Sequence, residues 1–248
     1  MNINIVTSGL NESENIPDFM SLIQELRSFF KNNIEVVFVD NGSTDISPIL
    51  LSKYAEFDKQ LTLIANPLGS QYADGIEAAL NKSTTNYSLL IPSDMQFAFQ
   101  DIVNVLESFL EYTLEGKRLH CMILTHRKLR YDGFYNEWRG RFWRRIVIAL
   151  FGMNASLDPA SQLRIICRDC VKKGTARNFL WDVENIAKFT RKSTNWFLVD
   201  VTFNPRLKGR STLASKRLRS ELSAFFGLMR LIIKISQNNL QDEAQPKL

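Results

Sequence analysis

The stretch INIVTSGL, residues 3–10, decides the fold together with the two segments that follow it. Its apolar, β-branched residues predict a buried strand that ends in small polar side chains. Residues 11–30, NESENIPDFMSLIQELRSFF, carry apolar side chains at helical spacing and acids near their start, which is typical of a helix N-terminus. Residues 34–45, IEVVFVDNGSTD, predict a second strand that runs into a turn. The chain therefore opens as strand, helix, strand.

The same alternation continues along the first part of the chain. The pattern predicts helices at 46–57 and 70–83 and strands at 61–66 and 87–94. Strands that alternate with helices favour an α/β fold with a parallel, doubly wound sheet. In such sheets ligands bind beyond the carboxyl ends of the strands, so we expect the functional residues there.

All four of these strand ends carry small polar residues. They are Ser8–Glu12, Asp40–Asp45, Asn66–Gly69 and Asp94–Gln96. The first strand is followed by TSGLNES, which lacks the GxGxxG pattern of dinucleotide-binding folds, and no Walker P-loop is present. The site is therefore not expected to hold a phosphate with a glycine loop.

The second half of the chain is more basic and more aromatic. Residues 125–153 are rich in arginine and aromatic side chains, and residues 206–235 predict a basic loop followed by an amphipathic helix. Between them we expect a loop and strand at 157–169, a helix at 179–193 and a strand at 196–205. The pattern indicates one domain over 1–215, with a C-terminal helix and polar tail at 216–248.

Composition limits the class of protein. The chain has 248 residues, 45% hydrophobic and 23% charged, and a net charge of +5. This length suits one large α/β domain with a sizeable core. A mild positive surplus suits phosphate-bearing ligands or an anionic membrane surface. No RNA- or DNA-binding motif is present, so nucleic acid is not an expected partner.

Cysteine usage and hydropathy indicate a cytoplasmic protein. The 3 cysteines are an odd number, which argues against a disulfide framework. The CxxC spacing of CRDC, residues 167–170, has no second pair beside it, so we do not expect zinc. The N-terminus lacks the pattern of a signal peptide, and no apolar run is long enough to span a bilayer. We expect a cytoplasmic protein, peripheral on the inner face of the membrane if it contacts one.

Six motifs, in their order and spacing, resemble family 2 glycosyltransferases with the GT-A fold, close to the polyprenyl-phosphate sugar transferases. They are LNESENI at 10–16, VDNGSTD at 39–45, PSDMQ at 92–96, RKLRYD at 127–132, LFGMNASLDPASQLR at 150–164 and RLKGRS at 206–211. Together they span roughly residues 1–215. Three residues depart from the family pattern: Leu10 replaces a tyrosine, and Asn41 and Pro92 each replace an acid.

The resemblance implies an inverting transfer of a sugar from a nucleotide-diphosphate sugar to an acceptor. A polyprenyl phosphate is the first candidate acceptor, and a saccharide hydroxyl in surface-polysaccharide assembly is the second. A third hypothesis is a degenerate GT-A domain that binds a nucleotide or a partner without turnover. The sequence leaves the sugar, the base and the oligomeric state open, and a homo-oligomer is compatible with it.

The resemblance also assigns roles to residues. It implies a Mg²⁺ or Mn²⁺ ion on Asp94 and Gln96, which would neutralise the departing diphosphate. Arg127 and Arg130 would hold a phosphate, and Asp158 would be the base if the acceptor is a hydroxyl. Together with Asp94 these three form the expected catalytic set. The expected nucleotide-binding residues are Ser8, Leu10, Glu12, Asp40, Asn41, Asn66, Gly69 and Arg206.

A simpler structural interpretation exists for most of these residues. Asp40 would then cap the next helix, and Asp94 would be a turn residue without a metal. Arg127 and Arg130 would lie in a solvated basic loop after a strand, and Asp158 would only position a neighbour. The basic amphipathic segments at 139–153 and 221–235 suit a membrane interface, but equally suit packing on their own domain.

Overall fold

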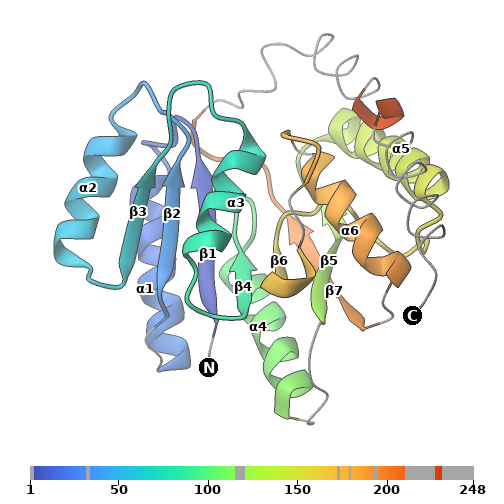
Figure 1. Cartoon of the computed structure of the whole chain (residues 1–248), viewed down its shortest axis with the longest axis horizontal. Coiled ribbons are helices and arrows are strands. Elements are labelled where there is room, and N and C mark those ends of the chain that lie inside the picture. Colours follow the sequence, from blue (N-terminus) through green and yellow to red (C-terminus); the bar gives the residue numbers. More distant parts are fainter. Residues whose placement is uncertain are drawn as a thin grey trace, which may run out of the picture.

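The computed structural model describes residues 3–31, 34–114, 121–171, 174–178, 180–192, 195–209 and 227–230. Seven strands form one sheet in the order β3-β2-β1-β4-β6-β5-β7 (Figure 1). The strands are β1 (Asn4–Gly9), β2 (Val36–Asp40), β3 (Leu61–Ala65), β4 (Tyr87–Leu90), β5 (Met122–Arg130), β6 (Arg164–Cys167) and β7 (Trp196–Phe203). The helices are α1 (Ile16–Phe30), α2 (Ser47–Phe57), α3 (Tyr72–Lys82), α4 (Phe99–Leu114), α5 (Phe134–Phe151) and α6 (Leu180–Lys192), with a short 3₁₀ turn at Arg168–Cys170.

The predicted alternation and the mostly parallel sheet are confirmed. β1 pairs in parallel with both β2 and β4, and β2 pairs in parallel with β3. β6 is antiparallel to its two neighbours, β4 and β5. β5 and β7 are again parallel. The carboxyl ends of β1, β2 and β4 therefore meet at one edge of the sheet, as expected.

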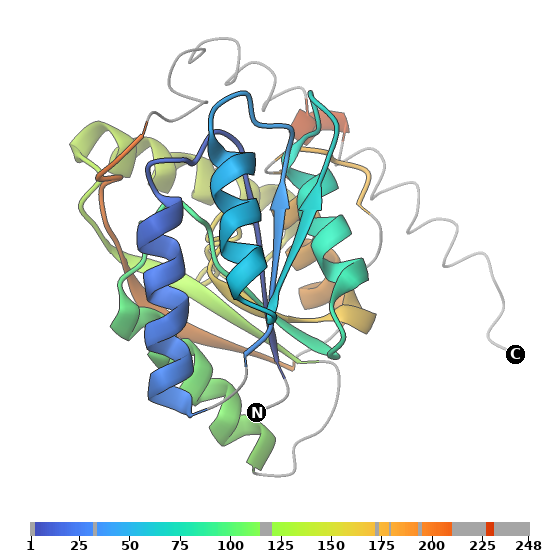
Figure 2. The ribbon, with the colours of Figure 1, turned by 90° about the vertical axis from the view of Figure 1, so that its left-hand side faces the viewer.

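Helices cover both faces of the sheet (Figure 2). One core layer joins α1, α2 and α4 to the sheet, and contains Phe19, Phe38 and Ile165. The other joins α3, α5 and α6 to the opposite face, and contains Val39 and Trp181. Strand residues alternate between these layers because successive side chains of a strand point to opposite faces.

The segment around Arg127 and Arg130 is a strand and not the loop that the sequence predicted. Arg127 and Arg130 were expected in a basic loop, but both belong to β5, and Arg130 is its last residue. Pairing with β7 over Met122–Arg130 extends this strand, with an irregularity after Arg127. The tertiary partner therefore overrides the polar composition of the segment.

The C-terminal helix and tail expected at 216–248 lie outside the described residues, except for 227–230. Within that short piece Leu228 is buried in the core layer of α6. No described helix is long and apolar enough to cross a bilayer.

Candidate active site

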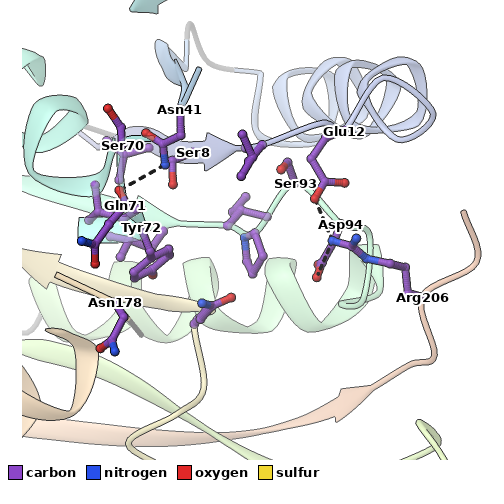
Figure 3. Close-up of a pocket in the computed structure, with 18 residues that line it drawn as sticks. Ser8, Glu12, Asn41, Ser70, Gln71, Tyr72, Ser93, Asp94, Asn178 and Arg206 are labelled. Carbon is purple, nitrogen blue, oxygen red and sulfur yellow. Dashed lines mark hydrogen bonds and ion pairs between the residues drawn. The ribbon is translucent and has the colours of Figure 1, made fainter. Parts of the chain in front are cut away.

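A cavity of about 370 Å³ opens at the carboxyl ends of β1, β2 and β4. Figure 3 shows two ends of this cavity. Amide and hydroxyl side chains gather at one end, and two carboxylates with an arginine gather at the other. The lining residues are Val6, Ser8, Gly9, Leu10, Glu12, Asn41, Ser70, Gln71, Tyr72, Ile76, Leu90, Ile91, Pro92, Ser93, Asp94, Gln162, Asn178 and Arg206.

The charged end is built around Arg206. Its Nη2 donates to Oε1 of Glu12 at 2.7 Å and lies 3.4 Å from Oδ2 of Asp94 (Figure 3). The second oxygen of Glu12 accepts a hydrogen bond from Asn15 at 2.6 Å. Oδ1 of Asp94 is buried and has no hydrogen-bond partner in the described part of the protein.

The charge balance at this end is negative. Burial raises the pKa values of both Glu12 and Asp94, and the positive charge of Arg206 opposes the rise in each case. Two buried carboxylates thus share one guanidinium from the cavity side. A buried carboxylate oxygen without a partner is costly, so this end of the cavity suits a further cation or hydrogen-bond donor.

The turn after β2 holds the loop that carries Glu12. The backbone N–H of Glu12 donates to Oγ of Ser47 at 3.0 Å, and that of Asn11 donates to Oγ of Ser43 at 2.8 Å. Asp40 is buried, and its carboxylate accepts hydrogen bonds from the backbone N–H and the hydroxyl of Ser43. These bonds between the two strand ends fix the direction in which Glu12 points.

Asp40 itself does not line the cavity. Its bonds to Ser43 brace the turn after β2 and do not cap α2, whose N-cap residue, Ile46, has no side-chain cap hydrogen bond. Asp45 likewise accepts from the backbone N–H of Ser47 at 2.9 Å. The nucleotide-binding role of Asp40 stays a prediction, which would require its turn to open toward the ligand.

The polar end is an amide chain across three elements. Asn41 accepts from Nδ2 of Asn66 at 3.0 Å through its Oδ1. Its own Nδ2 lies 3.4 Å from the carbonyl of Gln71, the residue before α3. Of the predicted nucleotide-binding residues, five line the cavity, namely Ser8, Leu10, Glu12, Asn41 and Arg206, whereas Asn66 contacts Asn41 behind it. Gly69 is exposed in the turn beyond and does not line the cavity.

Sequence reasoning missed the wall opposite β1. Gln162 and Asn178 come from the second half of the chain. Gln162 lies within the motif at 150–164, but neither residue was among the predicted site residues. Arg177 brings Asn178 to the cavity, because its guanidinium pairs with Asp74 and, at 2.8 Å, with Glu77, both on α3. The start of α3 was visible in the sequence as a helix N-terminus, but its role in lining the cavity was not.

Tyr72 is a second feature that the sequence did not reveal. Its hydroxyl lies 3.3 Å from Oδ1 of Asp182, and Asp182 is held in turn by the buried guanidinium of Arg164. Burial raises the pKa of Tyr72 well above its ordinary value. The ring therefore stands as a fixed, neutral part of the cavity wall.

The remaining predicted residues lie outside the cavity lining. Gln96 donates through Nε2 to the carbonyl of Asn204 at 3.0 Å, so its amide is bonded to the segment after β7. Arg127, Arg130 and Asp158 form a separate cluster in which both guanidinium groups lie 5.1 Å from the ring centroid of Phe203. The structure therefore groups Asp94 with Glu12 and Arg206, and separates it from the other expected catalytic residues.

Within that cluster Arg127 and Asp158 form an ion pair. Nε and Nη2 of Arg127 donate to the two oxygens of Asp158 at 2.7 and 2.9 Å. Burial alone would raise the pKa of Asp158, but the charge and hydrogen bonds of Arg127 bring it below its ordinary value. Arg130 makes a similar two-point pair with Asp132, at 3.1 and 2.6 Å.

Comparison with known proteins agrees with this architecture. A family model described as glycosyl transferase family 2 matches residues 5–150. A curated relative, a prophage bactoprenol glucosyl transferase homolog of Escherichia coli (strain K12), is 24% identical over 109 residues, which cover 44% of this chain and 36% of the relative. The match thus spans about a third of the length of that relative.

Solved structures share the fold at low sequence identity. Glucosyl-3-phosphoglycerate synthase from Mycobacterium tuberculosis in complex with UDP superposes with a TM-score of 0.67 at 16% identity, covering 93% of this chain and 80% of that chain. The same enzyme in complex with Mn²⁺ and UDP-glucose gives a TM-score of 0.65 at 16% identity, covering 99% and 80%.

Proposed function

This chain belongs to glycosyl transferase family 2, and we propose that it transfers a sugar, with inversion, from a nucleotide-diphosphate sugar to a polyprenyl phosphate. The observation that carries the proposal is the two-ended cavity at the carboxyl edge of the sheet. A nucleoside needs hydrogen-bonding groups, which the amide end of the cavity supplies. A diphosphate needs cationic groups, and the other end offers Arg206 beside two carboxylates that suit a divalent cation.

In the proposed complex the nucleoside lies at the amide end. Asn41 and the start of α3 offer both donors and acceptors there, and Tyr72 offers a fixed aromatic ring. The diphosphate then reaches toward Arg206, whose guanidinium can turn from the carboxylates to phosphate oxygens. The glucosyl-3-phosphoglycerate synthase structure, which shares the fold at low sequence identity, contains UDP, and this supports a nucleoside diphosphate as the ligand.

The charged end also fits one divalent cation. Asp94 has a buried oxygen without a partner in the described structure, and Glu12 contacts the same Nη2 of Arg206 as Asp94 does. In the described residues no three histidine, cysteine or acidic side chains converge as a closed metal cluster. We therefore propose that Asp94 holds Mg²⁺ or Mn²⁺ together with the donor's phosphates, and that Gln96 is not needed as a ligand. When bound, the ion would neutralise charge on the departing diphosphate.

The second cluster supports an acceptor that is already ionised. A hydroxyl acceptor needs a base, but Asp158 is occupied by Arg127 and has a lowered pKa, so it is a weak proton acceptor. A phosphate acceptor needs no base and is attracted by Arg127 and Arg130. The bactoprenol relative from Escherichia coli supports a lipid phosphate of this kind.

The first test is a binding experiment. UDP, GDP and dTDP are titrated calorimetrically into the full chain with Mn²⁺ and again with EDTA, for wild type and for Asp94→Asn. We expect one nucleotide to bind in a metal-dependent way, and we expect Asp94→Asn to lose that dependence. Binding that EDTA does not change would keep the nucleotide site and remove the metal from the proposal.

The second test is turnover. The matching nucleotide sugar is incubated with a polyprenyl phosphate in detergent micelles, and the sugar is followed into the organic phase. Product only with a soluble saccharide would instead support the hydroxyl acceptor. Nucleotide binding without product on either acceptor would support a non-catalytic GT-A domain, the hypothesis suggested by Leu10, Asn41 and Pro92.

A further inference from the structure

Helix α5 presents aromatic side chains to solvent along one side. Phe134, Trp138 and Phe142 follow one another at intervals of four residues and are 85, 58 and 48% exposed. Residues four apart lie on the same face of a helix, so the three rings form one stripe. The rings of Trp138 and Phe142 are stacked, with centroids 5.7 Å apart and planes 10° from parallel. We call these three residues, with Arg141 and Arg145, the α5 stripe.

Packing of α5 against its own domain does not explain why these three rings are present. Among its residues only Val147 and Phe151, in its last two turns, are buried. The first turns of the helix, from Phe134 onward, bury no residue. Contiguous exposed apolar surface of this kind marks an interaction site in most soluble proteins.

The charge of the helix indicates the partner. α5 contains four arginines and one acid, Glu137. Arg141 and Arg145 are exposed, and they are three and seven residues after Trp138, which places them on the same side of the helix. Arg139 lies farther round, with its guanidinium 5.8 Å from the ring centroid of Tyr135. Aromatic rings flanked by arginines are suited to the headgroup region of an anionic bilayer, where the rings reach the acyl boundary and the guanidinium groups meet lipid phosphates.

We infer that the α5 stripe docks the protein onto an anionic lipid bilayer. The helix would lie in the plane of the interface. Figures 1 and 2 both show α5 at the outside of the molecule.

The docked helix would also bring the cluster of Arg127, Arg130 and Asp158, where we propose that the acceptor phosphate binds, close to the lipid. α5 begins four residues after Arg130, and a Cβ added at Gly140 would collide with Nη1 of Arg130. The guanidinium of Arg130 thus lies against the backbone of the same helix. This link to a lipid acceptor rests on the proposed function, whereas the docking surface itself does not.

The test is co-sedimentation of the full chain with vesicles. One set contains phosphatidylcholine alone and the other also contains phosphatidylglycerol. The variants are Trp138→Ser/Phe142→Ser and Arg141→Gln/Arg145→Gln. Phe57→Ser is the matched control, because Phe57 is 88% exposed but belongs to α2 on the opposite sheet face.

We expect wild type and Phe57→Ser to bind the phosphatidylglycerol vesicles equally. The aromatic double variant should lose binding, and each arginine removed should weaken it by about fivefold. Binding should also fall as salt is raised. Unchanged far-UV circular dichroism and an unchanged melting temperature would show that the variants are folded. Failure of wild type to bind anionic vesicles would overturn the inference and favour a protein partner for this face, and so would unchanged binding by both double variants. A failure of the sugar-transfer proposal would leave the vesicle result untouched.

Discussion

Arg127 forms a bidentate ion pair with Asp158, with Nε 2.7 Å from Oδ2 and Nη2 2.9 Å from Oδ1. Both side chains are largely buried, at 12 and 4% exposure. We therefore propose that the pair acts as one unit, in which Asp158 orients Arg127 for a phosphate and does not remove a proton.

A double-mutant cycle tests that unit. We expect Arg127→Ala and Asp158→Asn each to lower kcat/KM by roughly 10²-fold, because a guanidinium displaced by about 1 Å loses its productive position. The double variant should be no worse than the poorer single one. Initial rates of sugar transfer over a pH series provide the measurement. Additive losses, or loss of the acidic limb of the profile in Asp158→Asn alone, would instead identify Asp158 as a base.

The same pair also contributes to stability. Asp158→Asn leaves Arg127 buried without its counter-charge, which should lower the free energy of unfolding by about 3–5 kcal/mol at neutral pH. The pKa of Asp158 is lowered in the folded protein, so this contribution is present above the unfolded pKa of about 3.9 and is lost as pH falls through the folded value. The difference between wild type and variant should therefore shrink in acid.

Urea denaturation at neutral and acidic pH measures this difference. Asp200→Asn is the control, because Asp200 pairs with Lys128 and is 48% exposed, so its loss should matter far less. Equal destabilisation by both substitutions would show that the buried pair contributes no more to stability than the exposed pair of Lys128 and Asp200.

The sequence predicted more of the fold than of the site. The apolar periodicity of residues 3–94 was enough for the parallel strands, because local side-chain pattern and tertiary burial agree there. The antiparallel direction of β6 has no local signature, since a short buried strand looks the same in either direction. Arg127 was misplaced for a similar reason, because pairing with β7 holds its polar segment in the sheet.

The site residues also divide into those that the sequence could predict and those that it could not. Glu12, Asn41 and Asp94 each lie within four residues of a strand end, so sheet topology places all three at the cavity. Gln162 and Asn178 reach the cavity through contacts between distant segments, such as the pairs of Arg177 with α3. No spacing in the sequence encodes such a contact.

The raised pKa of Asp94 should make the proposed cation binding sensitive to pH. A cation needs the ionised carboxylate, so its apparent affinity should fall as pH falls through a midpoint above the ordinary aspartate value of about 3.9. Arg206 lowers the pKa values of Asp94 and Glu12. Arg206→Ala should therefore move the midpoint to higher pH.

Calorimetric titration of Mn²⁺ with UDP over a pH series measures that midpoint. Lys208→Ala is the matched control: it removes a cation from the same segment, but Lys208 pairs with Asp18, 2.6 Å away. A midpoint that shifts equally in both variants would mean that general charge, not contact with the carboxylates, sets the pKa.

Two helical glycines offer a paired test of the two sites. Glycine to alanine inside a helix ordinarily stabilises a protein by about 0.5–1 kcal/mol. At Gly75 of α3 a Cβ would lie 2.6 Å from Oδ1 of Asn41 and from Cβ of Ser8, both in the cavity wall. At Gly140 of α5 it would meet only the guanidinium of Arg130, the end of a flexible side chain.

We therefore expect the two substitutions to affect different ligands. Gly75→Ala should lower the melting temperature and weaken nucleotide binding, because Asn41 and Ser8 must move. Gly140→Ala should keep the nucleotide affinity and instead raise KM for the phosphate acceptor, because only Arg130 is displaced. Thermal melts, calorimetry and steady-state rates separate these outcomes. If Gly75→Ala bound the nucleotide as tightly as wild type, the amide end of the cavity would not be the nucleoside site.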